Sequence, residues 1–258
     1  MQCLDILLRK AGRLTENITQ NVAENYIDAY QHDCLGAVLY HSTGSSYIVS
    51  PWKMLTGQVE EEMEGQKKSV LDSFAEEVDC EEKCLLLERK TLRQHDNPLW
   101  FEARCKRLAA SHFPFVYNIW QTTSCHNIVK SVLIYQEIFS KAIQYGQMNE
   151  KRAILCYEER KGVTVGPCGL FVRPNLPYLG ASSDAIVGDE GLVEVKCLPS
   201  IGTTIKKVAK AGKIPCVHYI GEELCLKNSH RYWHQIQGQL MISKRGYCDL
   251  IIYSELGI

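Results

Sequence analysis

The feature that most constrains the fold of this chain is a change of sequence period near residue 163. Before that point helical signals dominate: apolar residues recur at three-to-four spacing, and Gly146 and Gly162 stand where helices commonly end. Asn97 followed by Pro98 favours a further helix start, because Asn caps and Pro tolerates the first helical position. The sequence therefore predicts helices at residues 98–111, 127–146 and 149–162.

After that point apolar runs of strand length take over. Residues 178–188 and 191–198 form two such runs, and the Gly-rich segment that joins them suits a hairpin turn. The other predicted elements are strands at 163–173 and 247–254 and a helix at 231–243. This order of helices, three strands, helix and strand predicts an α/β or α+β fold with helices packed on a sheet.

Composition indicates an ordinary globular protein, with 258 residues of which 45% are hydrophobic and 23% charged. No apolar run approaches the ~18–20 residues that cross a bilayer, so no membrane association is expected. The first residues lack a secretory signal, and Asp5 and Glu16 argue against a mitochondrial transit peptide. We therefore expect an intracellular protein, nuclear or cytoplasmic and not secreted.

The twelve cysteines are dispersed along the chain without a Cys-x-x-Cys pair. This pattern favours free thiols in a reducing compartment over a disulfide scaffold. A zinc site is the alternative, formed by Cys216, Cys225, His230 and His234. The histidine spacing fits one helical turn, but eight residues separate the cysteines where zinc fingers have about two to four. Ordinary core and surface roles are therefore favoured.

The formal net charge of −1 hides an uneven distribution. Residues 59–88 carry eleven acidic side chains and three lysines, a net charge of −8, which leaves +7 for the rest of the chain. This acidic stretch is either a solvated helix or linker, or a segment that occupies a basic groove when nucleic acid is absent. The largest basic cluster lies in residues 196–213. It either contacts the phosphates of a nucleic acid electrostatically or forms a solvated helix face. Its lysines include Lys206, Lys207 and Lys210.

The candidate chemistry lies in the predicted hairpin. Asp184 ends one strand, and Glu194 and Lys196 lie two residues apart on the next, so both point to the same face. Neighbouring carboxylates repel and need neutralisation, which Mg²⁺ or Mn²⁺ supplies through oxygen ligands. Such a cation and a lysine together suit phosphodiester hydrolysis. The alternative is a surface ion pair on an edge strand, since Glu-x-Lys occurs elsewhere in this chain.

The segment SSDAIVGDEGLVEVKC resembles the core of the PD-(D/E)xK nuclease superfamily, and specifically its YqaJ-type, lambda-exonuclease-like group. WFEARCKRLAAS, GQMNEKRAILCY and HQIQGQLMIS resemble three further family segments in the same order. The resemblance implies a restriction-endonuclease-like core, in which helices flank a mixed central sheet. The implied nuclease domain is 91–258, preceded by a region of unknown role at 1–90.

The resemblance also implies roles for individual residues. Asp184, Glu194 and Glu150 would hold Mg²⁺ or Mn²⁺, and Lys196 would serve the attacking water. Gln237, or alternatively Gln235, would steady the lysine or the substrate, unless both glutamines are only polar residues on an exposed helix face.

A second implied group binds a 5′-terminal phosphate of DNA. It consists of Arg104, Ser111 and Ser182, because guanidinium and hydroxyl groups donate to phosphate oxygens. Arg104 pairing with an acid and Ser111 ending a helix are the alternatives. Lys206, Lys207 and Lys210 are the further candidates for DNA contact.

The chain departs from the family pattern at two points. Ser183 stands where a proline usually precedes the first aspartate, which affects the stiffness of the turn and leaves the charges intact. The chain stops at Ile258, where relatives usually continue with a further helix, as expected of a fragment or a degraded copy.

The sequence thus favours a magnesium-dependent deoxyribonuclease, an exonuclease on linear duplex ends in recombination or mobile-element processing. An endonuclease on the same core is the first alternative. The second is a catalytically inactive module that binds nucleic acid or a protein. The family resemblance also leaves a homo-oligomer open.

Overall fold

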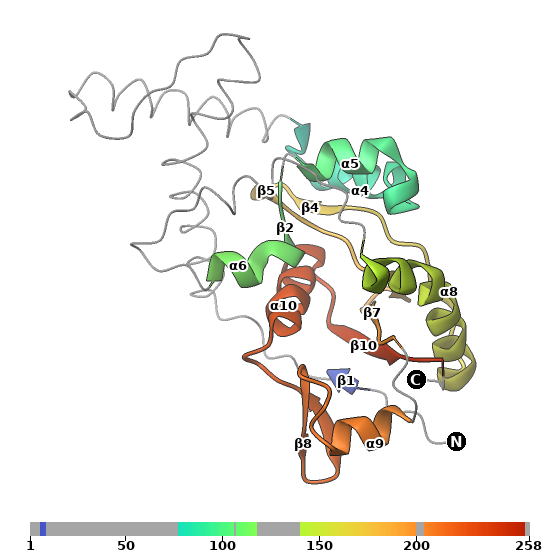
Figure 1. Cartoon of the computed structure of the whole chain (residues 1–258). Helices are drawn as coiled ribbons and strands as arrows, with labels where there is room; N and C mark the ends of the chain where they lie inside the picture. The colour runs from blue at the N-terminus through green and yellow to red at the C-terminus, as the bar shows by residue number, and fades with distance from the viewer. Residues whose placement is uncertain (1–5, 9–76, 106, 118–139, 200–203, 256–258) are drawn as a thin grey trace, which may run out of the picture.

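The computed structural model describes residues 6–8, 77–105, 107–117, 140–199 and 204–255 (Figure 1). Most of the predicted N-terminal region, including residues 59–76 of the acidic stretch, lies outside these ranges, so the proposed domain division stays a prediction. No helix in the described part is long and apolar enough to span a bilayer.

A five-stranded mixed sheet forms the centre of the molecule. Its strands follow the order β1 (Ile6–Leu8), β10 (Tyr247–Tyr253), β7 (Gly191–Cys197), β6 (Ala185–Val187) and β3 (Val165–Gly166). β7 and β10 are parallel, whereas the other neighbouring pairs are antiparallel. The predicted α/β fold with a mixed central sheet and flanking helices is therefore confirmed.

The predicted hairpin is also confirmed. β6 pairs antiparallel with β7, with Ala185 opposite Val193 and Val187 opposite Gly191. Gly188 in the connecting turn has a φ of 52°, a left-handed conformation that favours glycine. The turn residues and the apolar strands around them therefore agree on one register.

Two predicted strands are wrong in extent, because the chain changes sheets within each of them. The run 163–173 divides into β3 and β4 (Phe171–Arg173), and the run 178–188 divides into β5 (Leu176–Ala181) and β6. β4 and β5 form a separate sheet with β2 (Leu108–Ala109), in the order β2-β5-β4. Residues 182–184 connect this smaller sheet to the central one, and that connection positions the site described below.

The α8 helix (Lys141–Lys161) is continuous through Gly146, so the prediction that a helix ends there is wrong. Ser140 caps α8 by accepting a hydrogen bond from the Ile143 amide at 3.2 Å. A glycine inside a helix costs only about 0.5–1 kcal/mol relative to alanine, which the rest of α8 offsets. The predicted end at Gly162 is confirmed, with a φ of 64°. Residues 127–139 of the predicted earlier helix lie outside the described ranges.

The α5 helix (Pro98–Cys105) begins as predicted, with the Asn97 side chain accepting from the Leu99 amide at 3.0 Å. It ends well before residue 111, because Leu108 and Ala109 are buried and pair with β5 as β2. The short helices η3 (Ala110–His112) and α6 (Phe113–Tyr117) follow.

The α10 helix (Arg231–Ser243) occupies the predicted residues. The α9 helix (Ile205–Lys210) lies in the basic cluster for which a solvated helix face was one interpretation. The sequence did not predict the hairpin of β8 (Val217–Ile220) and β9 (Glu223–Leu226). Most of α4 (Glu81–Lys90) lies in the acidic stretch for which a solvated helix was one interpretation, whereas η2 (Gln94–Asp96) was not predicted.

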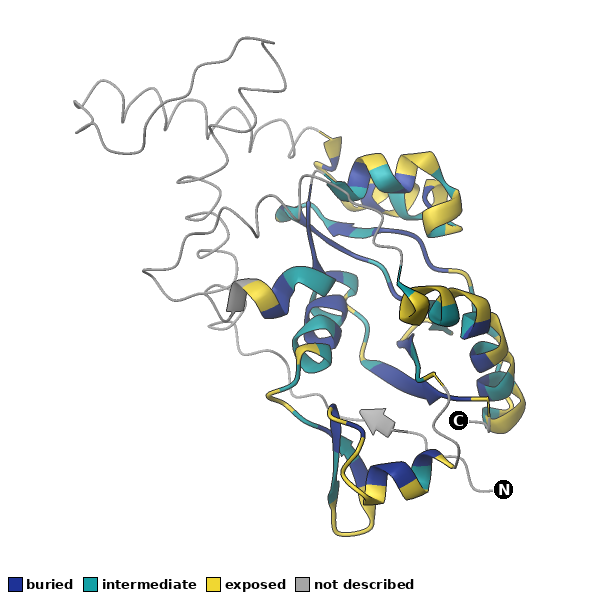
Figure 2. Ribbon diagram, in the orientation of Figure 1, coloured by how far each residue is buried: buried dark blue, intermediate teal, exposed yellow. Residues whose placement is uncertain are grey.

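Helices cover both faces of the central sheet (Figure 1). On one face, Ala153 and Tyr157 of α8 pack against Val193 and Val195 of β7. On the other face, Leu192 of β7 packs in a cluster with α9, α10 and the β8–β9 hairpin. Figure 2 shows the resulting layer of buried strands between partly exposed helices. Because β7 side chains alternate, Glu194 shares the α10 face with Leu192.

The α4 and α5 helices pack on β4 in a cluster of their own. Cys84 of α4 and Trp100 of α5 meet Leu170 and Val172 there. The side chain of Arg107 is fully buried and pairs with Glu77 at 2.7 Å, which attaches the segment before α4 to this unit. Trp100 and its neighbours are thereby held close to the connection between the two sheets.

Candidate active site

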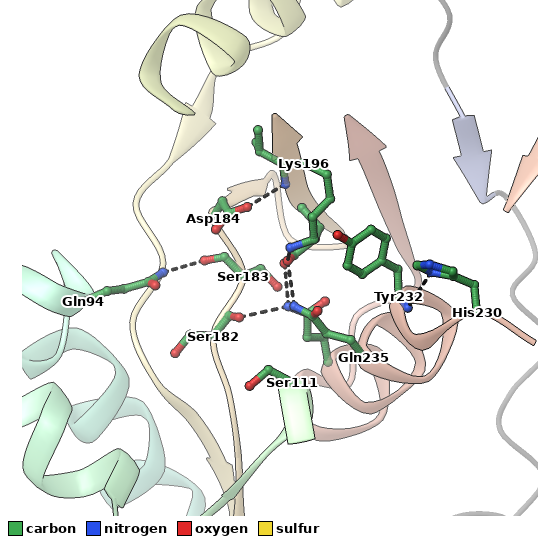
Figure 3. Close-up of polar contacts among 12 residues, drawn as sticks. Gln94, Ser111, Ser182, Ser183, Asp184, Lys196, His230, Tyr232 and Gln235 are labelled. Carbon is green, nitrogen blue, oxygen red and sulfur yellow. Dashed lines mark hydrogen bonds and ion pairs between the residues drawn. The ribbon is translucent and has the colours of Figure 1, made fainter. Parts of the chain in front are cut away.

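The hairpin brings Asp184, Glu194 and Lys196 together, and we call these three residues the acidic site. Figure 3 shows Asp184 beside Lys196. The Asp184 amide donates to the Val193 carbonyl at 3.0 Å, and Asp184 Oδ2 accepts from the Val195 amide at 2.5 Å. Lys196 Nζ lies 2.5 Å from Glu194 Oε1, which confirms that these two side chains share one face. Backbone pairing therefore places the predicted constellation as expected.

Burial sets the protonation behaviour of the acidic site. Only 4% of the Glu194 side chain and 23% of the Lys196 side chain are exposed. Burial, together with the charge of Glu194, raises the pKa of Asp184 well above its ordinary value. Burial alone would lower the pKa of Lys196, but the charges of Glu194 and Asp184 outweigh it and raise that pKa. Lys196 is therefore held as an ammonium ion.

Glu150 approaches the acidic site from α8. Burial raises the pKa of Glu150; the nearby His95 opposes this rise and the charge of Glu194 adds to it. Glu150 also contributes to the raised pKa of Asp184, so the three carboxylates act on one another electrostatically. The structure thus brings Glu150 to the residues with which sequence reasoning grouped it.

Two glutamines of α10 hold the Glu194 carboxylate, and neither is the favoured Gln237. Gln235 Nε2 donates to Glu194 Oε1 at 2.6 Å, and Gln239 Nε2 donates to Glu194 Oε2 at 2.7 Å. Gln237 is buried, and its Nε2 has no hydrogen-bond partner among the described residues. The reason is helical periodicity: residues four apart share a face, whereas a residue two positions away points elsewhere. That i, i+4 spacing is the signal that would have found Gln239.

A second group, which we call the anion pocket, consists of Trp100, Arg104, Ser111 and Ser182. Arg104 Nη2 donates to Ser111 Oγ at 2.9 Å, and Trp100 Nε1 donates to Ser182 Oγ at 2.9 Å. The Arg104 guanidinium lies 5.1 Å from the centre of the Trp100 ring, a cation–π contact. The three residues predicted to bind phosphate therefore lie together, and Trp100 is the member that sequence reasoning missed.

His112 is a partly buried neighbour of the anion pocket. Burial, with the nearby charge of Arg104, lowers the pKa of His112 to about 4. His112 is therefore neutral at physiological pH, and Arg104 carries the positive charge there.

Ser183, which replaces the family's proline, is fixed by other means. Its amide donates to Cys168 Sγ at 3.4 Å, a bond that proline cannot make, and its carbonyl accepts from Gln94 Nε2 at 2.5 Å. The backbones of Arg93 and Gln94 have φ values of 71° and 44°, a strained conformation that costs on the order of 1–3 kcal/mol per residue. The bonds that Gln94 makes stabilise this turn against the segment that carries Asp184.

The predicted DNA-contacting lysines lie elsewhere. Lys206, Lys207 and Lys210 belong to α9, which packs beside β8 at the opposite end of the molecule from α4 and α5 (Figure 1). Lys207 and Lys210 are exposed, and Lys206 is half-buried. Their contact with DNA remains a prediction.

The acidic site fits a hard divalent cation by its chemistry. Asp184, Glu194 and Glu150 offer carboxylate oxygens, and a cation would relieve the burial and repulsion that raise the pKa of Asp184 and Glu150. In the described ranges, however, no three acidic, histidine or cysteine side chains converge as a ready metal site. Both Glu194 oxygens accept hydrogen bonds, two at Oε1 and one at Oε2, which leaves one lone-pair site of Oε2 for a cation.

The four residues of the alternative zinc site do not form a metal-binding group of three or more side chains in the described ranges. Cys216 is buried in the apolar cluster under α9. Cys225 lies on β9 opposite His218. His230 caps α10 by accepting from the Tyr232 amide. These positions agree with ordinary core, strand and capping roles.

Comparison with known proteins gives one family match. The model of the YqaJ-like viral recombinase domain matches residues 99–246, which include the acidic site and the anion pocket. Among solved structures, an alkaline exonuclease (LHK-Exo) from Laribacter hongkongensis is 27% identical, with a TM-score of 0.46 over 61% of this chain and 74% of that chain. The complex of LHK-Exo with dAMP is 29% identical, with a TM-score of 0.47 and the same coverage. No curated protein matches the sequence.

Proposed function

The chain belongs to the family of YqaJ-like viral recombinase domains, and from this premise we propose that it is a metal-dependent DNA nuclease. Its proposed reaction is hydrolysis of phosphodiester bonds at the ends of linear duplex DNA, in recombination or mobile-element processing. The observation that carries the proposal is the acidic site, in which a buried glutamate, a half-buried aspartate and an ammonium ion share one end of a hairpin. A buried group of this composition is costly for folding and suits the binding of a cation and a phosphate.

In this proposal Asp184, Glu194 and Glu150 hold Mg²⁺ or Mn²⁺. The bound cation would polarise the phosphodiester and lower the pKa of a coordinated water. Lys196 donates from Nζ to the attacking water or to a phosphoryl oxygen on which charge develops. Its raised pKa supports donation rather than proton abstraction, because the ammonium form persists.

Neighbouring side chains orient the charged groups. Gln235 and Gln239 restrain the two oxygens of Glu194. The Tyr232 ring lies 5.0 Å from Lys196 Nζ and offers the ammonium a cation–π contact (Figure 3). These contacts reduce the freedom of the reacting groups before substrate binds, which is a recognised source of catalytic power.

The proposed preference for DNA ends rests on the anion pocket. Arg104 has the planar fork that binds a terminal phosphate through two hydrogen bonds, and Ser111 and Ser182 add hydroxyl donors. Trp100 holds Arg104 through its ring and Ser182 through its indole N–H. A pocket for a 5′-phosphate favours linear DNA with accessible ends over closed circles.

The test is digestion of 5′-phosphorylated linear duplex DNA in Mg²⁺, with wild type beside Lys196→Ala and a covalently closed circle as control. We expect the wild type to degrade the linear DNA and spare the circle, and Lys196→Ala to be inactive. Cutting of the circle would indicate an endonuclease. Absence of cleavage by the wild type in both Mg²⁺ and Mn²⁺ would reject the enzyme.

A non-catalytic nucleic-acid-binding module is the second candidate. The observation that favours it is the set of three donors on Glu194, from Lys196, Gln235 and Gln239, which compete with a cation for the carboxylate. It predicts salt-dependent DNA affinity that survives the double substitution of Asp184 and Glu194, together with no turnover.

A further inference from the structure

We propose that Gln239 couples the anion pocket to the acidic site, so that a 5′-phosphate and a divalent cation strengthen each other's binding. The inference rests on the proposed function, because it takes the phosphate and the cation as the ligands of these two sites. It assigns Gln239 as a positioning residue that acts through Glu194 and Ser182.

The geometry of Gln239 is the first argument. Its Nε2 donates to Glu194 Oε2 at 2.7 Å and to the Ser182 carbonyl at 2.9 Å. A side-chain amide nitrogen carries two hydrogens, so both bonds are made at once. The reversed amide would face two acceptors with its oxygen, so these partners fix its orientation. Gln239 is only 1% exposed, and water therefore cannot easily replace these bonds.

The position of Ser182 is the second argument. Its hydroxyl belongs to the anion pocket, where it accepts from Trp100, while its carbonyl accepts from Gln239. A phosphate that binds the hydroxyl fixes the same residue whose carbonyl holds Gln239. Gln239 in turn fixes the orientation of the Glu194 carboxylate, which is a proposed cation ligand. A continuous series of hydrogen bonds therefore joins the two sites.

Comparison with the other glutamines of α10 is the third argument. The described hydrogen bond of Gln235 reaches Glu194, whereas Gln239 reaches both Glu194 and Ser182. The Oε1 of Gln239 is buried without a partner in the described part of the chain, a cost that an apolar side chain would avoid. The two bonds, rather than packing, therefore explain a glutamine at this position.

The experiment measures binding in the absence of turnover. The affinity of the full chain for a 5′-phosphorylated duplex oligonucleotide is measured by fluorescence anisotropy with and without Ca²⁺, which takes oxygen ligands as Mg²⁺ does. The same duplex with a 5′-hydroxyl is the reference. For the wild type we expect Ca²⁺ to strengthen binding of the phosphorylated end about fivefold or more beyond its effect on the reference, the lower range of typical coupling.

The variants decide the role of Gln239. Gln239→Met keeps the size of the side chain and removes both donors, and we expect the coupling factor to fall close to one. Gln237→Met, the matched buried control two residues away, is expected to keep the coupling. If thermal unfolding shows that Gln239→Met does not fold, Gln239→Asn serves instead, because its shorter amide cannot reach both acceptors.

Three results would overturn the inference: no coupling in the wild type, unchanged coupling in Gln239→Met, or an equal loss in Gln237→Met. Cleavage by the wild type in Mg²⁺ is scored separately. Coupling that depends on Gln239 in a protein that does not cleave would support this inference and reject the nuclease. Cleavage without coupling would support the nuclease and reject this inference.

Discussion

The acidic site and the anion pocket are neighbours built in opposite ways. The acidic site comes from one hairpin, in which backbone pairing places Asp184 beside Glu194 and buries their charges. The anion pocket is assembled from three separate segments, α5, η3 and the connection at residue 182, through contacts between side chains. The first site is thus fixed by strand register and the second by tertiary packing.

This difference predicts which step of the proposed reaction each site controls. The buried carboxylates of the acidic site repel one another, so a cation and the scissile phosphate gain most there. Arg104 is half-buried, and its guanidinium contacts an aromatic ring and a hydroxyl, so its charge suits an anion. We therefore expect the acidic site to set the rate of cleavage and the anion pocket to select the DNA end.

The largest expected effect follows from Glu194→Gln. The substitution removes a proposed cation ligand and sets an amide against the donors of Gln235 and Gln239. We expect kcat to fall roughly 10²–10³-fold, the range for loss of one electrostatic contributor. The measurement is single-turnover cleavage of duplexes with 5′-phosphate and 5′-hydroxyl ends. Both rates should fall, and the preference for the 5′-phosphate end should shrink, because Gln239 links Glu194 to the anion pocket. Unchanged rates on both ends would contradict the role proposed for Glu194.

Arg104→Gln should have the complementary effect. Loss of charge-assisted bonds to the terminal phosphate, at about 1.5–3 kcal/mol, predicts a decrease in kcat/KM of about 10- to 100-fold for the 5′-phosphorylated end. The 5′-hydroxyl end should be nearly unaffected, because it offers no phosphate to lose. Arg104→Lys is the control; it keeps the charge but not the planar fork, and partial recovery is expected. Equal losses on both ends would assign Arg104 a structural role.

The same contrast explains how much could be predicted from sequence. Asp184, Glu194 and Lys196 lie within thirteen residues of chain, where alternation and a turn determine which side chains meet. The contacts of Gln239 depend instead on how α10 is rotated about its axis on the sheet. That rotation is set by packing of the buried Ile236 and Ile242 and is not visible in the local pattern. The local pattern therefore did not show that Gln235 and Gln239, and not Gln237, face Glu194, and the role of Gln237 stays a prediction.

The end of α5 failed for a related reason. Residues 106–111 continue a helical pattern, but Leu108 and Ala109 pair with Leu179 and Gly180, about seventy residues later in the chain. Pairing with a distant strand overrides local helix propensity. The anion pocket depends on this departure, because it turns Ser111 back toward Arg104.

The pH dependence of stability gives a further test of the buried carboxylates. Because the pKa of Asp184 is raised in the folded protein, folding favours its protonated form. Stability should therefore be lost as the pH rises from the ordinary aspartate range through the folded pKa. Asp184→Asn cannot ionise, so it should not lose stability in this way as the pH rises. Its side-chain oxygen can still accept a hydrogen bond from the Val195 amide. We expect its Tm at pH 8 to exceed that of the wild type by about 2 °C or more, and the gap to close toward pH 4.

Thermal unfolding in a metal chelator measures this difference. Added Mg²⁺ should raise the Tm of the wild type at pH 8 and leave that of Asp184→Asn nearly unchanged, because the proposed ligand is gone. A matched substitution in the anion pocket, Ser111→Ala, leaves Asp184 in place, so its Tm should differ from that of the wild type by the same amount at every pH. A Tm difference between Asp184→Asn and the wild type that does not grow from pH 4 to pH 8 would contradict the raised pKa of Asp184.

The smallest expected effect comes from Trp100→Phe, which tests whether the pocket acts as a unit. Phenylalanine keeps an aromatic ring beside Arg104 but loses the indole N–H that holds Ser182. One neutral hydrogen bond contributes about 1 kcal/mol, so affinity for a 5′-phosphorylated end should fall about fivefold. Trp100→Leu also removes the cation–π contact and should lower this affinity further.

Trp100→Phe also tests the link to the acidic site. Because Ser182 also binds Gln239, Trp100→Phe should weaken the effect of Ca²⁺ on end binding. Ser111→Ala should weaken end binding and leave the effect of Ca²⁺ intact. An unchanged effect of Ca²⁺ in both variants would mean that the pocket and the acidic site act independently.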